Sequence, residues 1–368
     1  MTPHATRPTL SRREILAAAG AAALPWPACA PAPRSPGATP AAPGPRLIDC
    51  QSHLFCPEIV ARMERRDRDP VVRVRDGERT VVMGDWHRKI RPHYSDVDAK
   101  LAAMDASGIA LTALSINDPG PEWFGDDGPT VAQVLNDYVA GIVKRHPARF
   151  IGLCVLPLQD EKAARAELDR CASRLGMKGV LLYTNLAGRF PDEPGFRWLF
   201  HRAAELDLPL LLHPALPVTA ALVKGYEMIS TLGNMFDDTL ALTRIILSGI
   251  LDQVPTLKLV CPHLGGTLPY IVGRLDHQVT VLKRGPMNLA CAPSEYLRRV
   301  WLDIVSPLPL AMKFAYDFTG PDRLLFASDH PWVDPRLIRD GLRSLDLPAA
   351  DEAKILGGNA AGLFRLPA

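Results

Sequence analysis

Two features that often reveal the class of a protein are absent from this 368-residue sequence. There is no charge excess, because 42 basic and 40 acidic residues give a formal net charge of only +2. This balance argues against a nucleic-acid-binding surface and against a polybasic membrane patch. There is also no Cys-x-x-Cys motif among the seven cysteines, which argues against zinc-finger and thioredoxin chemistry. A chain that is 47% hydrophobic can bury a large core and fits an enzyme acting on small molecules.

The cysteines give no further guidance, because the sequence does not decide whether any of them pair. Cys154 and Cys261 lie in apolar runs, where a free thiol packs as a small hydrophobic group.

The N-terminal segment differs from the rest of the chain. Twin arginines (12–13) precede an alanine-rich apolar run (16–24) and the small-residue triplet ACA (28–30). This order is typical of a twin-arginine export signal, and the apolar run is too short to span a bilayer. We expect residues 1–30 to be a signal peptide, residues 31–45 to be a disordered Pro/Ala-rich linker, and the cleaved protein to be periplasmic or secreted without a membrane anchor. An amphipathic helix with chance arginines, and a lipoprotein anchored through the cysteine of the triplet, are the alternatives.

Beyond residue 45, short apolar runs alternate with longer helical patterns. Each run is continuous and of strand length, as in parallel strands that are covered on both faces. The eight runs cover residues 47–50, 109–116, 150–156, 179–183, 209–212, 257–261, 300–305 and 324–327. Amphipathic segments lie between them, at 130–145, 162–175, 198–206 and 239–254. This rhythm predicts an α/β fold, a (β/α)8 TIM barrel over residues 46–368.

An open, doubly wound sheet is the alternative to the barrel. Such a sheet usually carries a glycine-rich phosphate loop after its first strand, whereas this sequence continues with QSH (51–53). The charged segment 62–93 does not fit the repeat. We expect a loop insertion after the first strand there, over the barrel mouth, with a hairpin turn around DG (76–77).

Polar side chains follow four of the predicted strands at their carboxyl ends. They are Gln51 and His53 after the first strand, His213 after the fifth, His263 after the sixth and Asp329 after the eighth. TIM barrels hold their catalytic groups on that face, so these side chains are expected to converge. Imidazoles with a carboxylate suit a divalent metal, and zinc is the first expectation. The sequence therefore predicts a metal centre with an open position for substrate.

The metal prediction rests on this convergence, because a single histidine at a strand end is more often a structural hydrogen-bonding group. His146, before a proline at a helix end, and His201, on an amphipathic helix, are expected to be surface or capping residues. His277 and His330 stay undecided; His330 adjoins Asp329 and either lines the site or supports it.

Several segments resemble one family. They are IDCQSH (48–53), RHPARF (145–150), LPLQD (156–160), LHP (212–214), CPHLGG (261–266), ASDHP (327–331) and GGNA (357–360). Together they resemble the aminocarboxymuconate-semialdehyde decarboxylase branch of the amidohydrolase superfamily, and the resemblance extends over residues 47–363. A set of motifs spread over the whole barrel is more specific than any one of them.

The resemblance implies a role for each polar residue at the mouth. His53 and His213 are expected to be metal ligands. Asp329 is expected to bind the metal and to shuttle a proton, and His263 to be the acid–base catalyst.

The resemblance also singles out Arg274, eleven residues beyond His263. In the named decarboxylase the arginine at this place reaches across a dimer interface to the substrate carboxylate, which implies a homodimer and a carboxylate substrate. The alternative is a local salt bridge to Asp276 on the helix surface.

Gln51 departs from the family pattern, which has His-x-His or Glu-x-His where this chain has QSH. A glutamine oxygen is a neutral and weak zinc ligand, so metal affinity is expected to fall. The site then holds its metal loosely, prefers a harder ion such as manganese or magnesium, uses three protein ligands, or has lost the metal.

The leading functional hypothesis is metal-dependent decarboxylation of a small aromatic or unsaturated carboxylic acid. Hydrolysis of a lactone, an amide or a carbon–carbon bond is the first alternative, because related barrels run both chemistries with nearly the same ligands. The second alternative is a binding protein that keeps the barrel but has lost catalytic activity because of Gln51.

Overall fold

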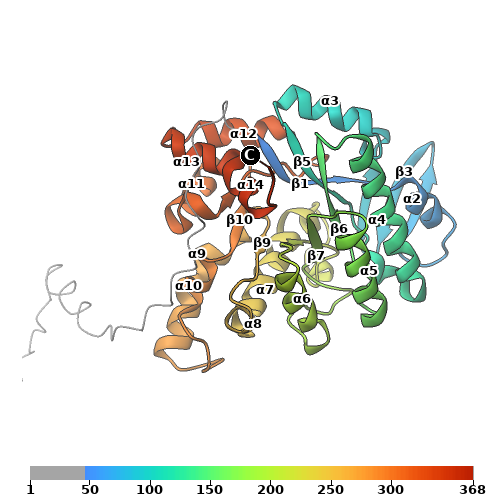
Figure 1. Ribbon diagram of the computed structural model, residues 1–368. Coiled ribbons are helices and arrows are strands. Elements are labelled where there is room, and N and C mark those ends of the chain that lie inside the picture. The colour runs from blue at the N-terminus through green and yellow to red at the C-terminus, as the bar shows by residue number, and fades with distance from the viewer. Residues whose placement is uncertain (1–45, 368) are drawn as a thin grey trace, which may run out of the picture.

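All eight predicted apolar runs are parallel strands of one barrel in the computed structural model, which describes residues 46–367 (Figure 1). In barrel order they are β1 (Ile48–Leu54), β5 (Leu111–Ile116), β6 (Phe150–Cys154), β7 (Gly179–Tyr183), β8 (Leu210–His213), β9 (Leu259–Cys261), β10 (Trp301–Asp303) and β11 (Leu324–Leu325). The predicted fold class is therefore confirmed. The expected signal peptide and linker lie outside the described residues.

The barrel closes between β1 and the segment that follows β11. The amide of Cys50 donates to the carbonyl of Phe326 at 3.0 Å, and the amide of His53 donates to the carbonyl of His330 at 2.8 Å. Between them, the amide of Asp329 donates to the carbonyl of Gln51 at 2.9 Å. This closing seam sets the first and last predicted site segments side by side.

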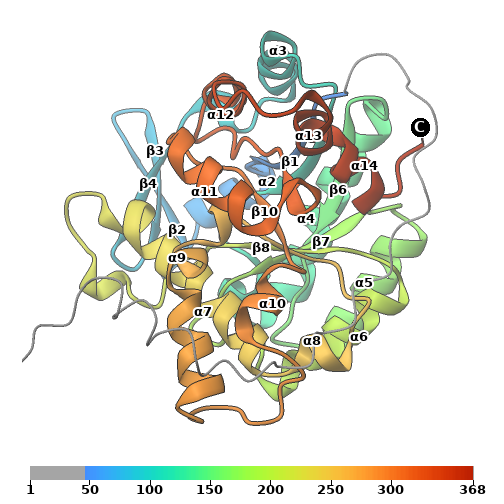
Figure 2. The same ribbon diagram turned by 90° about the vertical axis from the view of Figure 1, so that its left-hand side faces the viewer.

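Helices surround the strands (Figure 2). The larger ones are α3 (Val97–Ser107), α4 (Gly128–Arg145), α5 (Glu161–Ser173), α6 (Arg197–Glu205), α7 (Asn234–Leu247), α9 (Leu268–Asp276), α11 (Pro309–Thr319) and α12 (Pro335–Arg343). The shorter ones are α2 (Pro57–Glu64), α8 (Ile250–Gln253), α10 (Pro293–Leu297), α13 (Ala349–Ala353) and α14 (Asn359–Leu363). None of the described helices combines the length and the apolar character needed to cross a bilayer.

Helix α4 illustrates how the sequence pattern produces this ring. Its buried side chains include Val131, Leu135, Val139 and Ile142, which recur every three or four residues and form one apolar stripe against the strands. The predicted segment 239–254 differs from the expectation, because it is two helices. Gly249, with φ of 73°, separates α7 from α8.

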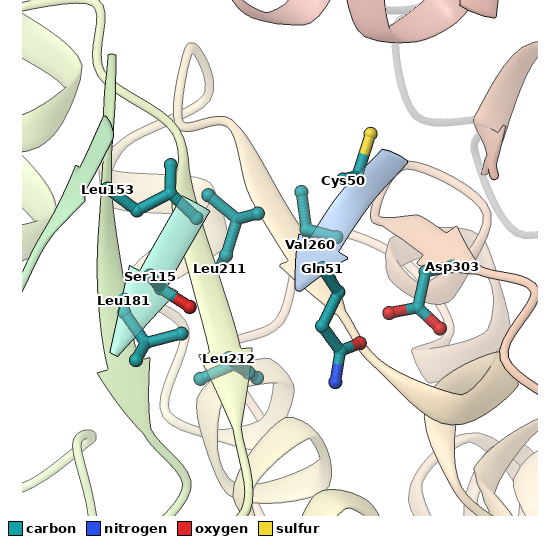
Figure 3. A pocket seen from close by; sticks show the side chains of 9 residues that line it. All are labelled: Cys50, Gln51, Ser115, Leu153, Leu181, Leu211, Leu212, Val260 and Asp303. Carbon is teal, nitrogen blue, oxygen red and sulfur yellow. The ribbon is translucent and has the colours of Figure 1, made fainter. Parts of the chain in front are cut away.

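The barrel interior is filled and is not a pore. Leucine and valine side chains from β6 to β9 occupy its middle and line one small cavity together with Gln51 and Asp303 (Figure 3). They leave a cavity of about 10 Å³, on the scale of one water molecule. Cys154 and Cys261 are buried free thiols, as expected. The polar residues at the strand ends therefore rest on an apolar floor.

The insertion after β1 forms a three-stranded antiparallel sheet of β2 (Val71–Arg75), β3 (Glu78–Met83) and β4 (Trp86–Ile90). Asp76 and Gly77, both with positive φ, make the predicted hairpin turn, whereas the third strand was not predicted. Arg88 of β4 anchors the sheet to the barrel mouth. Its guanidinium makes two 2.7 Å hydrogen bonds to the Asp118 carboxylate and lies over the rings of Trp86 and Trp332.

Candidate metal centre and active site

His53, His213 and Asp329 meet at the carboxyl end of the barrel. Each offers a ligand atom, and these atoms lie within 4.8 Å of one another. His53 Nε2 is 3.3 Å from Asp329 Oδ1, and the two imidazole rings are 4.4 Å apart between centroids. The structure thus brings together three residues from β1, from β8 and from the segment after β11.

Hydrogen bonds at Nδ1 prepare both imidazoles to act as ligands through Nε2. His213 Nδ1 lies 2.7 Å from the carbonyl oxygen of Pro214, which can only accept, so Nδ1 carries the proton. His53 Nδ1 lies 2.7 Å from the Ser115 hydroxyl, which itself donates to the carbonyl of Ser52 at 3.5 Å. A proton on Nδ1 leaves Nε2 as the nitrogen that can bind a metal in each ring.

The protonation of His213 and Asp329 and the unpaired Nε2 of His53 fit a cation site. Burial, with the neighbouring His53, holds the pKa of His213 well below its usual range, so this ring is neutral. Burial alone would raise the pKa of Asp329, but the neighbouring imidazoles of His263 and His53 lower it, so this group is a carboxylate. His53 Nε2 is buried and has no hydrogen-bond partner among the described residues. Two imidazole nitrogens and one carboxylate oxygen therefore form a donor set that suits a divalent metal.

His263 lies beside this triad and is held by a carboxylate. Its Nδ1 donates to Asp238 Oδ2 of α7 at 2.9 Å, and its Nε2 faces Asp329 Oδ2 at 3.8 Å. Burial alone would lower the pKa of His263, but the bond to Asp238 and the charge of Asp329 raise it well above its ordinary value. His263 therefore presents a proton at Nε2 to the mouth of the barrel.

The backbone is strained both at His263 and at Asp329. Their φ angles are 52° and 56°, in the left-handed region that side chains other than glycine seldom adopt. Asp303 helps to hold the strained turn, because its Oδ1 accepts the amide hydrogen of His263 at 2.8 Å. Strain of this kind persists only where the surroundings enforce it, and it concentrates at functional sites.

Gln51 lies next to the triad. Its Nε2 is 3.4 Å from Asp329 Oδ1, and its Oε1 is buried without a hydrogen-bond partner among the described residues. In this orientation the amide donates to Asp329. The carbonyl oxygen of Gln51 lies on the side of Asp303 (Figure 3). Gln51 thus contacts a triad member and is placed to support it through its amide.

Lys100 is a residue that sequence reasoning missed. It projects from α3, is only 1% exposed, and donates from Nζ to Ser52 Oγ (2.7 Å), His330 Nδ1 (2.7 Å) and the His330 carbonyl (3.0 Å). Burial lowers its pKa to about 7 against the opposing charges of Asp49 and Asp329. Its spacing to buried Met104 was the available signal, because residues i and i+4 share one helix face. Lys100 therefore fastens the closing seam that carries His53 and Asp329.

Lys100→Met is expected to weaken metal binding about 10- to 100-fold, the usual effect of losing a group that orients ligands. It is also expected to lower the free energy of unfolding by ~1–3 kcal/mol, because buried acceptors lose their donor. Metal titration of the apoprotein and urea unfolding measure both effects. Lys144→Met, on the exposed last turn of α4, is the matched control. Unchanged metal affinity in Lys100→Met would show that the seam does not position the ligands.

The remaining predicted residues lie away from the triad, except for His330. His330 adjoins it and bonds to Lys100, and its backbone pairs with β1. His146 is the C-terminal cap of α4, and His201 is exposed on α6, as expected. His277 is exposed beyond α9. Arg274 is exposed on α9 and has no ion pair with Asp276 among the described residues.

Comparisons with known proteins agree with this geometry. The amidohydrolase family model matches residues 48–366. γ-Resorcylate decarboxylase from Rhizobium is 30% identical over 308 residues, covering 77% of this chain and 92% of that protein. 2-Amino-3-carboxymuconate-6-semialdehyde decarboxylase from Dictyostelium discoideum is 27% identical over 292 residues, covering 76% and 79%.

A solved structure extends the likeness to the fold. The crystal structure of a dihydroxybenzoic acid decarboxylase from Polaromonas, with bound manganese and an inhibitor, superposes with a TM-score of 0.73 at 25% identity, over 87% of this chain and 97% of that one. The chain belongs to the amidohydrolase superfamily, in the branch of the aminocarboxymuconate-semialdehyde decarboxylases.

Proposed function

We propose that this protein is a metal-dependent decarboxylase of a small aromatic or unsaturated carboxylic acid. The observation that carries the proposal is the meeting of two imidazoles and a carboxylate, free to bind a cation, with a protonated imidazole at His263. The relatives named above, which are decarboxylases of such acids, support it.

The proposed reaction replaces a carboxylate by a proton. A divalent ion held by His53, His213 and Asp329 would supply positive charge that binds and polarises the oxygens of the acid. His263 gives the proton from Nε2 to the carbon that bears the carboxylate, while Asp238 stabilises the charged ring through Nδ1. The bond between this carbon and the carboxylate breaks, and the acid anion plus one proton become the product and carbon dioxide. Asp329, 3.8 Å from Nε2, helps to keep the imidazole protonated through its negative charge.

The test is carbon dioxide release from a panel of hydroxybenzoic and unsaturated acids, with metal-loaded and metal-stripped protein. Release by the loaded protein alone supports the proposal. Turnover of lactones or amides without carbon dioxide would establish the hydrolase instead. A native protein that stays metal-free and inactive, while Gln51→His takes up metal, would establish the disarmed binding protein.

The proposed metal is zinc or manganese. Zinc follows from the imidazole donors, whereas the Polaromonas relative binds manganese, and the neutral amide of Gln51 adds no charge to the site. Loading the apoprotein separately with zinc, manganese and magnesium, and measuring affinity and turnover, decides which ion serves the reaction.

The proposal includes a homodimer in which Arg274 reaches the partner's substrate. Arg274 shares one face of α9 with Tyr270, which is 83% exposed, and the neighbouring α7 exposes Phe236 and Leu240. Clustered exposed apolar side chains of this kind mark interaction surfaces.

Tyr270→Glu is therefore expected to convert the dimer to a monomer in light-scattering chromatography and to lower activity while Arg274 is intact. Arg274→Met is expected to keep the dimer and to raise KM at least about tenfold, since a charged hydrogen bond is worth ~1.5–3 kcal/mol. Leu337→Glu on α12, also at an exposed leucine, is the control. A wild-type protein that is a monomer at micromolar concentration would contradict the proposal.

The proposal also places the enzyme in the periplasm or outside the cell. It rests on the twin arginines and the segment after them, which lie outside the described residues. Replacing both arginines by lysine is expected to keep the protein in the cytoplasm, as measured by cell fractionation.

A further inference from the structure

Tyr183 occupies the barrel mouth beside the metal centre, and nothing in the proposed reaction uses it. It is the last residue of β7 and lies opposite His213 of β8 in the strand register. Leu181 faces the barrel interior (Figure 3), so Tyr183, two residues further along the strand, faces the same side at the mouth. The Tyr183 and His213 rings are 6.2 Å apart between centroids and nearly perpendicular.

Glu122 reaches the same place from the loop after β5. It belongs to the short helical turn Pro121–Asp127. Its carboxyl group and the Tyr183 ring both pack against Gly120. A side chain at position 120 would collide with both of them, so the close approach requires glycine. Two polar residues from different strand ends are thereby packed side by side.

Neither polar group has a hydrogen-bond partner among the described residues. Both carboxyl oxygens of Glu122 and the hydroxyl of Tyr183 are buried and unpaired. Buried polar atoms are rarely left in this state, so a group from outside the chain is expected to satisfy them.

The pair carries no compensating positive charge. Among the described residues, Arg88 is the cation that interacts with Tyr183. Its Nη1 and Nη2 bind the Asp118 carboxylate, which balances its charge, whereas its Nε is buried without a hydrogen-bond partner. Burial, with the nearby charge of Asp118, raises the pKa of Glu122 to about 8. At neutral pH the carboxyl is mostly protonated, and it both donates and accepts a hydrogen bond.

We infer that Tyr183 and Glu122 form a polar subsite that binds a neutral hydrogen-bonding substituent, such as a hydroxyl group, on the acid whose carboxylate lies at the metal centre. A second carboxylate is disfavoured, because it would be buried next to Asp118, whose charge already balances Arg88, with no other cation facing the pair from the described part of the chain. This inference rests on the proposed function for the orientation of the acid, and it adds that the substrate is a hydroxylated monocarboxylic acid and not a dicarboxylic acid.

Calorimetric binding to the manganese-loaded protein tests the subsite without relying on turnover. The probes are benzoate, 3-hydroxybenzoate, 4-hydroxybenzoate and isophthalate. The native protein is expected to bind one hydroxybenzoate at least about tenfold more tightly than benzoate and than isophthalate, the scale of one or two good hydrogen bonds. Tyr183→Phe and Glu122→Leu are expected to bring the ratio of hydroxybenzoate to benzoate affinity close to one, with benzoate affinity changed less than threefold.

Glu122→Gln is the conservative variant, and it is expected to keep most of the preference because an amide is neutral and both donates and accepts. Tyr138→Phe, which removes a hydroxyl from α4 outside the mouth, is the matched control and is expected to change nothing. Circular dichroism confirms folding of each variant.

The subsite would be overturned if Tyr183→Phe and Glu122→Leu left the ratio of hydroxybenzoate to benzoate affinity unchanged. It would also be overturned if the native protein bound isophthalate more tightly than the hydroxybenzoates, or bound none of the four acids. If the native protein releases carbon dioxide but the two variants keep the native ratio of hydroxybenzoate to benzoate affinity, the subsite alone is refuted. The expected preference without carbon dioxide release from any acid refutes the proposed reaction and leaves the subsite standing.

Discussion

His213→Ala is expected to strip the protein of its metal and to abolish activity. Within residues 46–367, the site offers His53, His213 and Asp329 as strong ligands, so the variant retains two. Four-ligand structural zinc sites bind with ~10–16 kcal/mol, on the order of 3–4 kcal/mol per ligand, which predicts metal affinity lower by about two to three orders of magnitude. Elemental analysis after dialysis and titration with a chelating indicator measure this loss.

The His213→Ala result needs a control for the substitution itself. His201→Ala provides it, because His201 is an exposed histidine on α6 with no contact to the triad. The control is expected to retain metal and turnover within about twofold, as surface substitutions usually do. If His213→Ala keeps one metal per chain with native affinity, His213 is not a ligand and the proposed centre is wrong.

Gln51→His isolates the departure from the family pattern. In the structure the Gln51 amide faces Asp329 Oδ1 at 3.4 Å. An imidazole there offers a nitrogen lone pair where the amide offers a hydrogen. The comparison of metal affinity between Gln51→His and His213→Ala therefore shows whether three protein ligands suffice.

The barrel could be predicted because each of its strands corresponds to a short, local pattern in the sequence. Each strand is buried on both faces. A continuous apolar run between two amphipathic segments, such as Gly179–Tyr183, therefore indicates a parallel strand. Parallel topology then brings the carboxyl ends of the strands to one face, so His53, His213 and Asp329 could be expected to meet without any structure. The meeting of these three side chains is thus a consequence of strand order.

The groups that tune the site were not predictable in the same way. Asp238 lies on α7 and reads in the sequence as one more acidic residue of an amphipathic helix, yet it is fully buried against His263. Ser115, which fixes the proton on His53, is 62 positions away along the chain. Such contacts depend on how a helix or a neighbouring strand packs, and the periodicity of a segment does not encode its partner.

His263→Asn is expected to lower kcat by about 10²–10⁴-fold, the usual range for a positioned acid or base, with the metal retained. The reason is that His263 Nε2 carries the proton that faces Asp329 at the mouth, and an amide cannot give up a proton at neutral pH. Asp238→Asn is expected to have the smaller effect, about 10²-fold, because it removes the charge that keeps His263 protonated while leaving the ring in place. Steady-state rates with metal content measured on the same samples give both values.

The double variant distinguishes catalysis from structural damage. If Asp238 acts only through His263, then adding Asp238→Asn to His263→Asn is expected to cost almost nothing more, because residues that act as a unit are not additive. Asp237→Asn is the matched control on the same helix, since Asp237 is equally buried but bonds to Thr184 and Asn185. It is expected to lower stability and to change kcat less than about threefold. Additive losses in the double variant would mean that Asp238 supports the fold of the site independently of the proton on His263.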